Sequence, residues 1–236
     1  MRFHVITPFP EAFASYLGVS IIKRAIQRRL LSVRFVNPRD FTGDKHRTLD
    51  GKPYCGGAGM VLMAEPILKA VEAVRPKDKG RRTKVLVLSA KGKQFNQTIA
   101  HDWAKRCDRL VLISGRYEGI DERVKRILRA EEVSIGPYVL TDGDVAAMAV
   151  VSAVSRLIPG VIKLESLQEE SHWNLLLKRK ARSASLGHAG GRRGLEYPHY
   201  TRPEVLRWQG KVYRVPKVLL CGDHKKIAMW RKMHGR

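Results

Sequence analysis

The stretch LVLISGRYEGIDER, residues 110–123, gives the clearest structural signal in the chain. It begins with a continuous apolar run, which is typical of a strand buried on both faces of a parallel sheet. A turn containing glycine follows. Asp121 and Glu122 then stand in the first turn of a helix expected over residues 120–129, where the helix dipole favours acids. The stretch therefore predicts a strand, a turn and a helix in succession.

The same alternation continues on both sides of this stretch. Apolar runs predict strands at residues 3–6, 33–36, 85–89 (VLVLS), 110–114 and 133–140 (VSIGPYVL). Helical periodicity predicts helices at residues 11–31, where Gly18 is a point of interruption, at 66–74, 96–105, 120–129 and 145–158. The last helix is apolar nearly all round, so we expect it in a core or an interface. The alternation favours an α/β fold with a parallel sheet and helices on both faces.

The sequence changes character after Pro159 and Gly160. Residues 163–193 lack periodicity and are rich in Lys and Arg, which is typical of a linker. We expect a sheet-containing domain over 1–162, a basic flexible linker over 163–193 and a small, mainly helical unit over 194–236.

The charge of the chain points to a polyanionic partner. Forty-five Lys and Arg residues against 22 Asp and Glu give a net charge of +23. Nucleic acid is the first interpretation, and an anionic membrane surface or a ribosome-associated role are the alternatives. No apolar run approaches the roughly 18 residues of a membrane span, and no signal peptide is evident, so a cytoplasmic protein is expected. Neither the three Cys nor the eight His have metal-ligand spacing, and no metal site is predicted.

Three strand ends are followed by turns that contain glycine. The pairs are Ser89 with Gly92, Gly115 with Gly119, and Gly136 with Gly143. Ligands of open parallel sheets bind beyond the carboxyl ends of the strands, so these turns predict one ligand site, although each glycine taken alone can simply turn the chain. Neither GxGxxG nor GxxxxGK[ST] is present, and a nucleotide-phosphate site is not indicated.

Five blocks then occur in a fixed order: PYCGGAGM (53–60), GRYEGIDERV (115–124), SIGPYVL (134–140), AVSRLIPGV (153–161) and YPHYTRPEV (197–205). Together they closely resemble the bacterial tRNA (guanine-N1)-methyltransferase family, a group of trefoil-knot, SPOUT-type methyltransferases. The chain departs from the family pattern at Cys55, Ala90, Pro137 and Asp142, in a longer stretch over 173–193, and in a shortened C-terminal unit.

The resemblance implies a deep trefoil knot made by the three strand-end loops, with S-adenosylmethionine bound in it. It implies an obligate homodimer with shared active sites, and methylation of guanosine 37 next to the tRNA anticodon, which limits frameshifting. It leaves open whether magnesium takes part. The implied cofactor contacts are Leu88, Ser89, Gly115, Tyr117, Glu118, Gly119, Ile135, Gly136, Pro137, Tyr138, Val139, Leu140 and Gly143.

The chemistry of guanine N1 requires a base and a cation. N1 carries a proton at neutral pH, and negative charge develops at O6 when that proton leaves. The family pattern implies Glu170 as the general base and Arg156 as the cation. Two other interpretations stay open: Arg156 can cap a helix, and Glu170 can be a solvated acid, with its neighbour Glu169 as the alternative base.

Contacts with RNA are expected from a loop rich in glycine and from cationic side chains close to aromatic ones, which can stack on unpaired bases. The candidates are Gly56, Gly57, Gly59, Arg116, His199, Tyr200 and Arg202. The linker 163–193 is hypothesised to order over an extruded base, and Tyr54, Trp103 and Trp173 are expected to pack. Two rival functions remain, namely another knotted RNA methyltransferase that acts on a ribose 2′-oxygen or on ribosomal RNA, and an RNA-binding protein without enzymatic activity.

Overall fold

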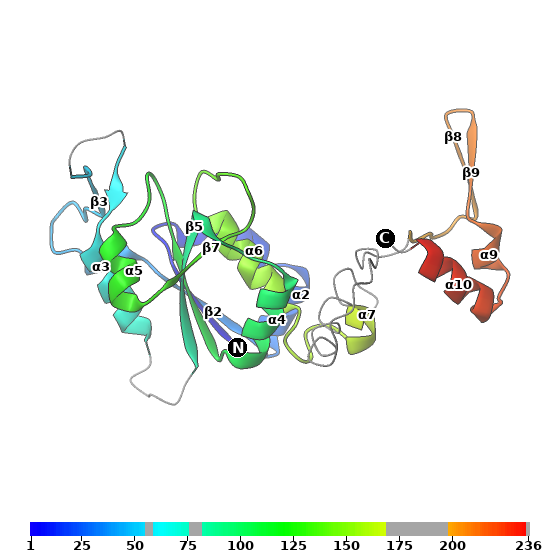
Figure 1. Ribbon diagram of the computed structural model, residues 1–236, viewed down its shortest axis with the longest axis horizontal. Coiled ribbons are helices and arrows are strands. Elements are labelled where there is room, and N and C mark those ends of the chain that lie inside the picture. Colours follow the sequence, from blue (N-terminus) through cyan, green and yellow to red (C-terminus); the bar gives the residue numbers. More distant parts are fainter. Residues whose placement is uncertain (55–58, 76–81, 169–197, 235–236) are drawn as a thin grey trace, which may run out of the picture. The chain divides into compact units, whose positions relative to one another are not determined.

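A computed structural model of the chain describes residues 1–54, 59–75, 82–168 and 198–234 (Figure 1). The chain divides into two compact units, Met1–Lys163 and Leu164–Arg236. The predicted division at 162 and 193 into three parts stays a prediction, because residues 169–197 lie outside the described part of the chain.

The first unit is built on a five-stranded sheet with the order β2-β1-β6-β5-β7. Its strands are β1 (Arg2–Ile6), β2 (Ser32–Val36), β5 (Thr83–Gln94), β6 (Arg109–Ser114) and β7 (Glu131–Ser134). Every pair of neighbouring strands is parallel. The predicted parallel sheet is confirmed, and all five predicted strands are present. A short antiparallel pair, β3 (Asp50–Gly51) and β4 (Val61–Leu62), was not expected.

The predicted strand 133–140 is wrong beyond Ser134. The Ser134 hydroxyl accepts a hydrogen bond from the N–H of Gly136 (3.2 Å) and donates one to its carbonyl (2.8 Å), which closes a turn. Residues 135–140 therefore form a loop at the carboxyl end of β7.

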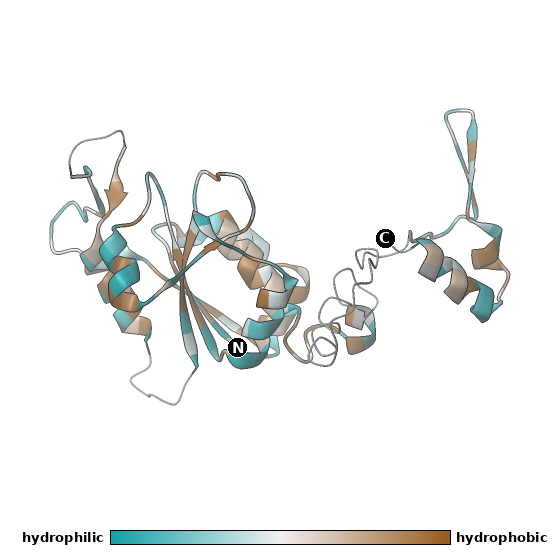
Figure 2. Cartoon of the chain, viewed as in Figure 1, coloured by the Kyte–Doolittle hydropathy of each residue, from teal (hydrophilic) through white to brown (hydrophobic). Residues whose placement is uncertain are grey.

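Helices cover both faces of the sheet, as predicted. They are α1 (Ala14–Leu17), α2 (Ser20–Gln27), α3 (Ala64–Val74), α4 (Gln97–Arg106), α5 (Glu122–Leu128) and α6 (Asp144–Ser155), with 3-10 turns at Pro10–Phe13 and Pro38–Phe41. One buried cluster joins the strands to α1, α2, α4 and α6, and a second joins them to α3 and α5. Figure 2 shows hydrophobic residues along α3, α5 and α6.

The predicted helix 11–31 is divided at Gly18, whose N–H donates to the Ala14 carbonyl (3.0 Å) at the end of α1. Ser20 begins α2 with a positive φ of 53°, which changes the direction of the chain. The interruption expected at Gly18 is thus confirmed, although the segment forms two short helices rather than one long one.

Helix α6 is buried mostly within its own chain. Seven of its twelve residues are buried: Asp144, Ala146, Ala147, Val150, Val151, Val154 and Ser155. The core thus accounts for most of its apolar character, while Val145 remains 48% exposed.

The end of β5 crosses β7 at close range. Leu88 and Lys93 both pair with Val133, so residues 89–92 bulge out of the ladder. A Cβ atom on Gly92 would lie 2.4 Å from the backbone nitrogen of Val133. Only glycine permits this approach, so Gly92 serves the packing of β5 against β7.

The second unit contains α7 (Leu164–Gln168), α9 (Lys217–Leu220), α10 (His224–His234) and an antiparallel hairpin of β8 (Val205–Trp208) and β9 (Lys211–Arg214). Helix α10 contains the basic residues Lys225, Lys226, Arg231 and Lys232. The hairpin was missed, although Gln209 and Gly210 both have the positive φ that a two-residue hairpin turn requires. Helix α7 lies inside the segment predicted to be a linker. Among the described residues, no helix is long and apolar enough to cross a membrane.

Candidate functional site

A cavity of about 400 Å³ lies at the carboxyl ends of β5, β6 and β7. Eleven of the thirteen predicted cofactor residues line it: Leu88, Ser89, Gly115, Tyr117, Glu118, Gly119, Ile135, Tyr138, Val139, Leu140 and Gly143. Gly136 is buried in the turn after Ser134 and Pro137 is exposed, and neither lines the cavity. The structure therefore brings the three strand-end loops together around one site, where a parallel sheet binds its ligand.

Two of these loops touch through their backbones. The Gly143 N–H donates to the Gly115 carbonyl over 2.8 Å, and a Cβ on Gly143 would lie 2.7 Å from the Gly115 nitrogen. The loop after β7 therefore lies directly on the end of β6. Tyr117, in the second loop, has a φ of +56°, a left-handed conformation that is uncommon for a residue other than glycine.

The predicted RNA loop is attached to the second of these loops. The Glu118 N–H donates to the Met60 carbonyl (3.1 Å), and the Leu62 N–H donates to the Gly119 carbonyl (3.0 Å). Gly59 lies against the side chain of Glu118, because a Cβ there would come within 2.4 Å of its Oε1. Gly59 is thus placed beside the cavity, while Gly56 and Gly57 lie outside the described residues.

Arg116 holds three loops together. Its Nη2 atom lies 3.1 Å from Oδ2 of Asp144 and 3.5 Å from Oδ2 of Asp142. Its guanidinium carbon lies 4.1 Å from the centre of the Phe9 ring, at the end of β1. The predicted contact of Arg116 with RNA stays a prediction, because its guanidinium already has these partners within the protein.

The cavity carries more acid than base. Its lining includes five carboxylates, Glu118, Asp121, Glu122, Glu132 and Asp142, against the three cations Lys91, Arg116 and Lys125. Lys125 lies 3.0 Å from Glu132, and the hydrogen bond that it donates to Glu122 lowers the pKa of that carboxyl group. Surplus negative charge opposes phosphate and favours a ligand with a positive charge.

Arg156 does not reach this cavity in its own chain. It follows the last residue of α6, whose first residue, Asp144, lies beside the cavity. The twelve residues of α6 separate the two ends by about 18 Å at 1.5 Å per residue. Glu169 and Glu170 lie outside the described residues.

The remaining predicted substrate residues belong to the second unit. His199, Tyr200 and Arg202 are exposed there, and the ring centre of Tyr200 lies 6.3 Å from that of Trp230 on α10. The packing expected of Trp103 is confirmed, because it is buried and stacked on Phe95. The packing expected of Tyr54 is wrong, because its side chain is 94% exposed, and Trp173 lies outside the described residues.

The sequence reasoning missed the acidic partners of Arg116. Asp142 and Asp144 flank Gly143 in a D-G-D run, and two acids spaced around a turn before an apolar helix were an available signal. Asp142 also accepts a hydrogen bond from the N–H of Asp144 (2.9 Å) at the start of α6. Within the described ranges, no three His, Cys, Asp or Glu side chains gather in a way that could hold a metal ion.

The fold and the cavity define a parallel α/β protein that binds its ligand between three strand-end loops. The model of the family tRNA (Guanine-1)-methyltransferase TrmD matches residues 1–236. Relatives named tRNA (guanine-N1-)-methyltransferase include proteins of Thermomicrobium roseum (50% identical, covering 99% of this chain and 78% of the relative) and Chloroflexus aggregans (47%, 98% and 82%). A third, from Carboxydothermus hydrogenoformans, is 44% identical over 98% of this chain and 81% of its own length. The chain belongs to the tRNA (guanine-1)-methyltransferase TrmD family.

Proposed function

We propose that this chain transfers the methyl group of S-adenosylmethionine to N1 of a guanosine in tRNA, at position 37 next to the anticodon. The observation that carries the proposal is the cavity between three strand-end loops, formed by the motifs that the family shares. Methylation at this position would limit frameshifting during translation.

The residues of the cavity fit S-adenosylmethionine. Leu88, Ile135 and Leu140 offer apolar surface for a flat base, and Gly115 and Gly143 line the cavity with backbone that no side chain covers. The surplus of carboxylates suits a ligand that carries a positive sulfonium. A volume of about 400 Å³ lies in the range of small-molecule pockets. Among the described residues nothing gathers as a metal site, and magnesium stays an open question.

Bound in this cavity, S-adenosylmethionine supplies a methyl group that its sulfonium makes reactive without a metal. The protein must remove the proton from guanine N1, and Glu170 is the proposed acceptor of that proton. Arg156 is proposed to stabilise the negative charge that develops at O6. N1 gains the methyl group and loses its proton to the carboxylate, so the guanine keeps its charge.

We further propose that the active enzyme is a homodimer with shared sites. Arg156 and the cavity lie at opposite ends of α6, about 18 Å apart, so one chain alone cannot bring them to the same guanine. A second copy would supply Arg156 to the cavity of the first. The exposure of Val145 on α6 is compatible with such a contact.

A trefoil knot is the proposed topology of the loops around the cavity. Two observations support it. The chain after Leu88 crosses closely over β7, and the chain after β7 returns to rest on the end of β6. The knot would hold the three loops in a fixed arrangement without a bound ligand.

Methyl transfer to tRNA transcripts that differ only at nucleotide 37 tests this function. We expect methyl transfer to a transcript with guanosine 37 and none to a transcript with adenosine at that position. Transfer that does not depend on nucleotide 37 would favour the other knotted methyltransferases, which act on ribose or on ribosomal RNA. A chain that binds RNA but takes up no S-adenosylmethionine in calorimetry would be a plain RNA-binding protein.

A further inference from the structure

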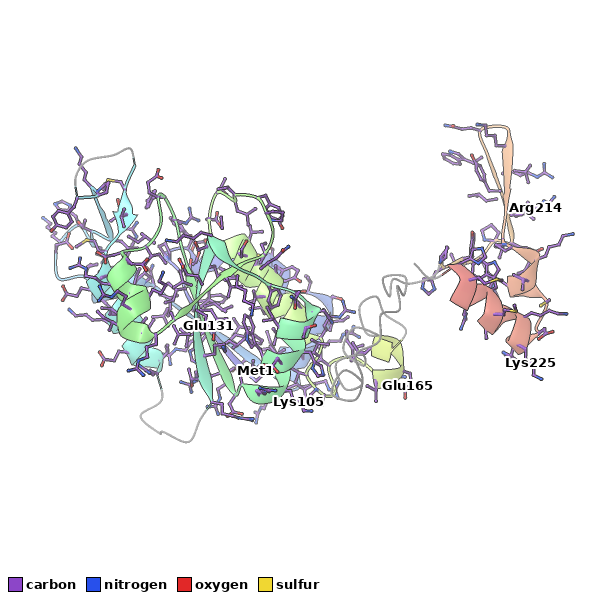
Figure 3. The ribbon with its side chains drawn as sticks, viewed as in Figure 1. Met1, Lys105, Glu131, Glu165, Arg214 and Lys225 are labelled. Carbon is purple, nitrogen blue, oxygen red and sulfur yellow. The ribbon has the colours of Figure 1, made fainter. Side chains whose placement is uncertain are left out.

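A second cavity, of about 440 Å³, lies at the amino ends of the strands. Four cations line it, namely Arg2 at the start of β1, Arg82 before β5, Lys105 on α4 and Arg109 at the start of β6. We call these four residues the amino-end cluster. Figure 3 labels Met1 and Lys105, both of which line this cavity. Nothing in the proposed methyl transfer uses it.

The charge of this cluster is only partly neutralised. Among the described residues, Asp108 is the one carboxylate in the lining, and it pairs with Arg82 over 3.3 Å. Arg2 and Lys105 are exposed and form no ion pair with any residue that the structure describes. Asp102 and Glu131 pair with Arg106 and Lys84 instead.

The side chain of Arg109 is held in one position within the cluster. It is only 8% exposed, and it donates a hydrogen bond to the carbonyl of Val74 at the end of α3. Its backbone pairs directly with Arg2 in the β1–β6 ladder, so both side chains stand on the same face of the sheet. The exposed Arg2 side chain therefore starts from a strand position next to a second, buried arginine.

His4 is a buried histidine close to the arginines at this end of the sheet. It lies two residues after Arg2 on the same face, is 7% exposed, and has no hydrogen-bond partner for either ring nitrogen among the described residues. Burial and the charges of Arg109, Arg34 and Arg2 lower the pKa of His4 to about 4. Burial is the largest cause of this shift, and the positive charges of the three arginines add to it.

We propose that the amino-end cluster binds the sugar-phosphate backbone of tRNA at a distance from the methylated base. This inference rests on the proposed function, because it assigns a second contact to the same substrate. The cofactor cavity carries surplus carboxylates and cannot itself attract phosphates, so part of the affinity for tRNA must come from cations elsewhere on the protein.

The spacing of the two cavities suits one RNA molecule. Strand β6 has six residues and separates its two ends by about 20 Å. A strand of duplex nucleic acid advances about 3.4 Å per nucleotide and has to pass around the protein, so the phosphates that reach the cluster lie at least about six nucleotides from the methylated base. Phosphate contacts of this kind position the substrate without reading its sequence.

Equilibrium binding of tRNA at several salt concentrations tests the proposal with the double variant Arg2→Gln and Lys105→Gln in the full chain. Both side chains are exposed, so their removal should leave folding and the affinity for S-adenosylmethionine unchanged. We expect tRNA affinity to fall roughly tenfold and the slope of log affinity against log salt to fall by about two. The matched control is Lys23→Gln with Arg24→Gln on α2, which removes the same charge and lines neither cavity.

An equal loss in the control pair, or an unchanged salt slope in the test pair, would overturn the inference. Vesicles with phosphatidylserine serve as a second probe, and binding to them that disappears only in the test pair would assign the cluster to a membrane surface instead. A wild-type chain that neither binds nor methylates tRNA would refute the proposed function itself, which is a separate result. A wild-type chain that methylates tRNA, combined with an unaffected test pair, would reject only the amino-end cluster.

Discussion

Nη2 of Arg116 lies 3.1 Å from Oδ2 of Asp144, and this contact joins the loop after β6 to the first residue of helix α6. The Asp144 side chain is only 3% exposed, so water screens the pair weakly. The same guanidinium rests on Phe9 at the end of β1. One buried ion pair thus fixes the relative positions of the loops that form the cofactor cavity.

Substitution of Asp144 by Asn should loosen this arrangement. The substitution leaves Arg116, which is 25% exposed, with only the longer contact to Asp142, so we expect the free energy of unfolding to fall by about 2 kcal/mol. S-adenosylmethionine should also bind more weakly, because the loops are no longer held together. Urea unfolding and calorimetry measure the two effects.

Asp40→Asn is the matched control, since Asp40 pairs with Arg47 at 3.7 Å on an exposed surface. That change should cost less than about 1 kcal/mol and leave cofactor binding intact. If the two variants were equally stable, the pair of Arg116 and Asp144 would not organise the cavity.

Gly92→Ala should strongly destabilise the first unit. The added Cβ would lie 2.4 Å from the Val133 nitrogen, so the end of β5 would have to move away from β7. We expect a loss of about 3 kcal/mol, compared with a change within about 0.5 kcal/mol for Gly43→Ala, where nothing lies within 4 Å of the new atom. Thermal or urea unfolding compares the two, and equal stabilities would argue against the close crossing of β5 over β7.

His4 should make stability depend on pH. Its pKa lies at about 4 in the folded chain, below the ordinary value of 6.5, so the unfolded chain binds the proton first as pH falls. The stabilisation is complete above pH 6.5, declines between pH 6.5 and 4, and amounts to about 3 kcal/mol at most. The free energy of unfolding, measured at pH 7.5, 5.5 and 4.5, should decline less steeply with falling pH in His4→Leu than in the wild type. Parallel declines in the two proteins would exclude His4 as the cause.

Shared active sites predict complementation between two inactive variants. Arg156→Gln removes the proposed cation, while Ala90→Trp places an indole ring at an exposed position in the lining of the cofactor cavity. Each variant alone should be inactive. Mixed dimers from co-expression contain one intact site, so roughly a quarter of the wild-type rate should return. A mixture as inactive as its components would place Arg156 and the cavity of the same chain in one site, contrary to the 12-residue helix between them.

Much of the fold follows from local patterns in the sequence. The runs at 85–89 and 110–114 are continuous and apolar because both faces of these strands are buried, and this pattern predicts a parallel sheet correctly. The prediction failed where local patterns compete with contacts between distant segments. Residues 135–140 resemble a strand, yet the hydrogen bonds between Ser134 and Gly136 end β7 early. The hairpin in the second unit was missed because its strands are short and exposed rather than alternating between a core and solvent.

The candidate site shows a similar limit. The position of the cavity could be predicted, because strand ends of a parallel sheet meet at one edge. The role of Arg116 could not, since its partners Asp142 and Asp144 stand almost thirty residues further along the chain. The separation of Arg156 from the cavity also depends on the direction of α6, which no motif reveals.

The identity of the methylated atom decides whether the enzyme transfers methyl to guanine N1. A tRNA transcript with guanosine 37 is treated with the enzyme and S-adenosylmethionine, digested to nucleosides and analysed by mass spectrometry against standards. We expect 1-methylguanosine from the wild-type chain, none from Glu170→Gln even though that variant still binds S-adenosylmethionine, and a reduced but measurable amount from Glu169→Gln. A product methylated on the ribose 2′-oxygen, or wild-type amounts of 1-methylguanosine from Glu170→Gln, would contradict this expectation.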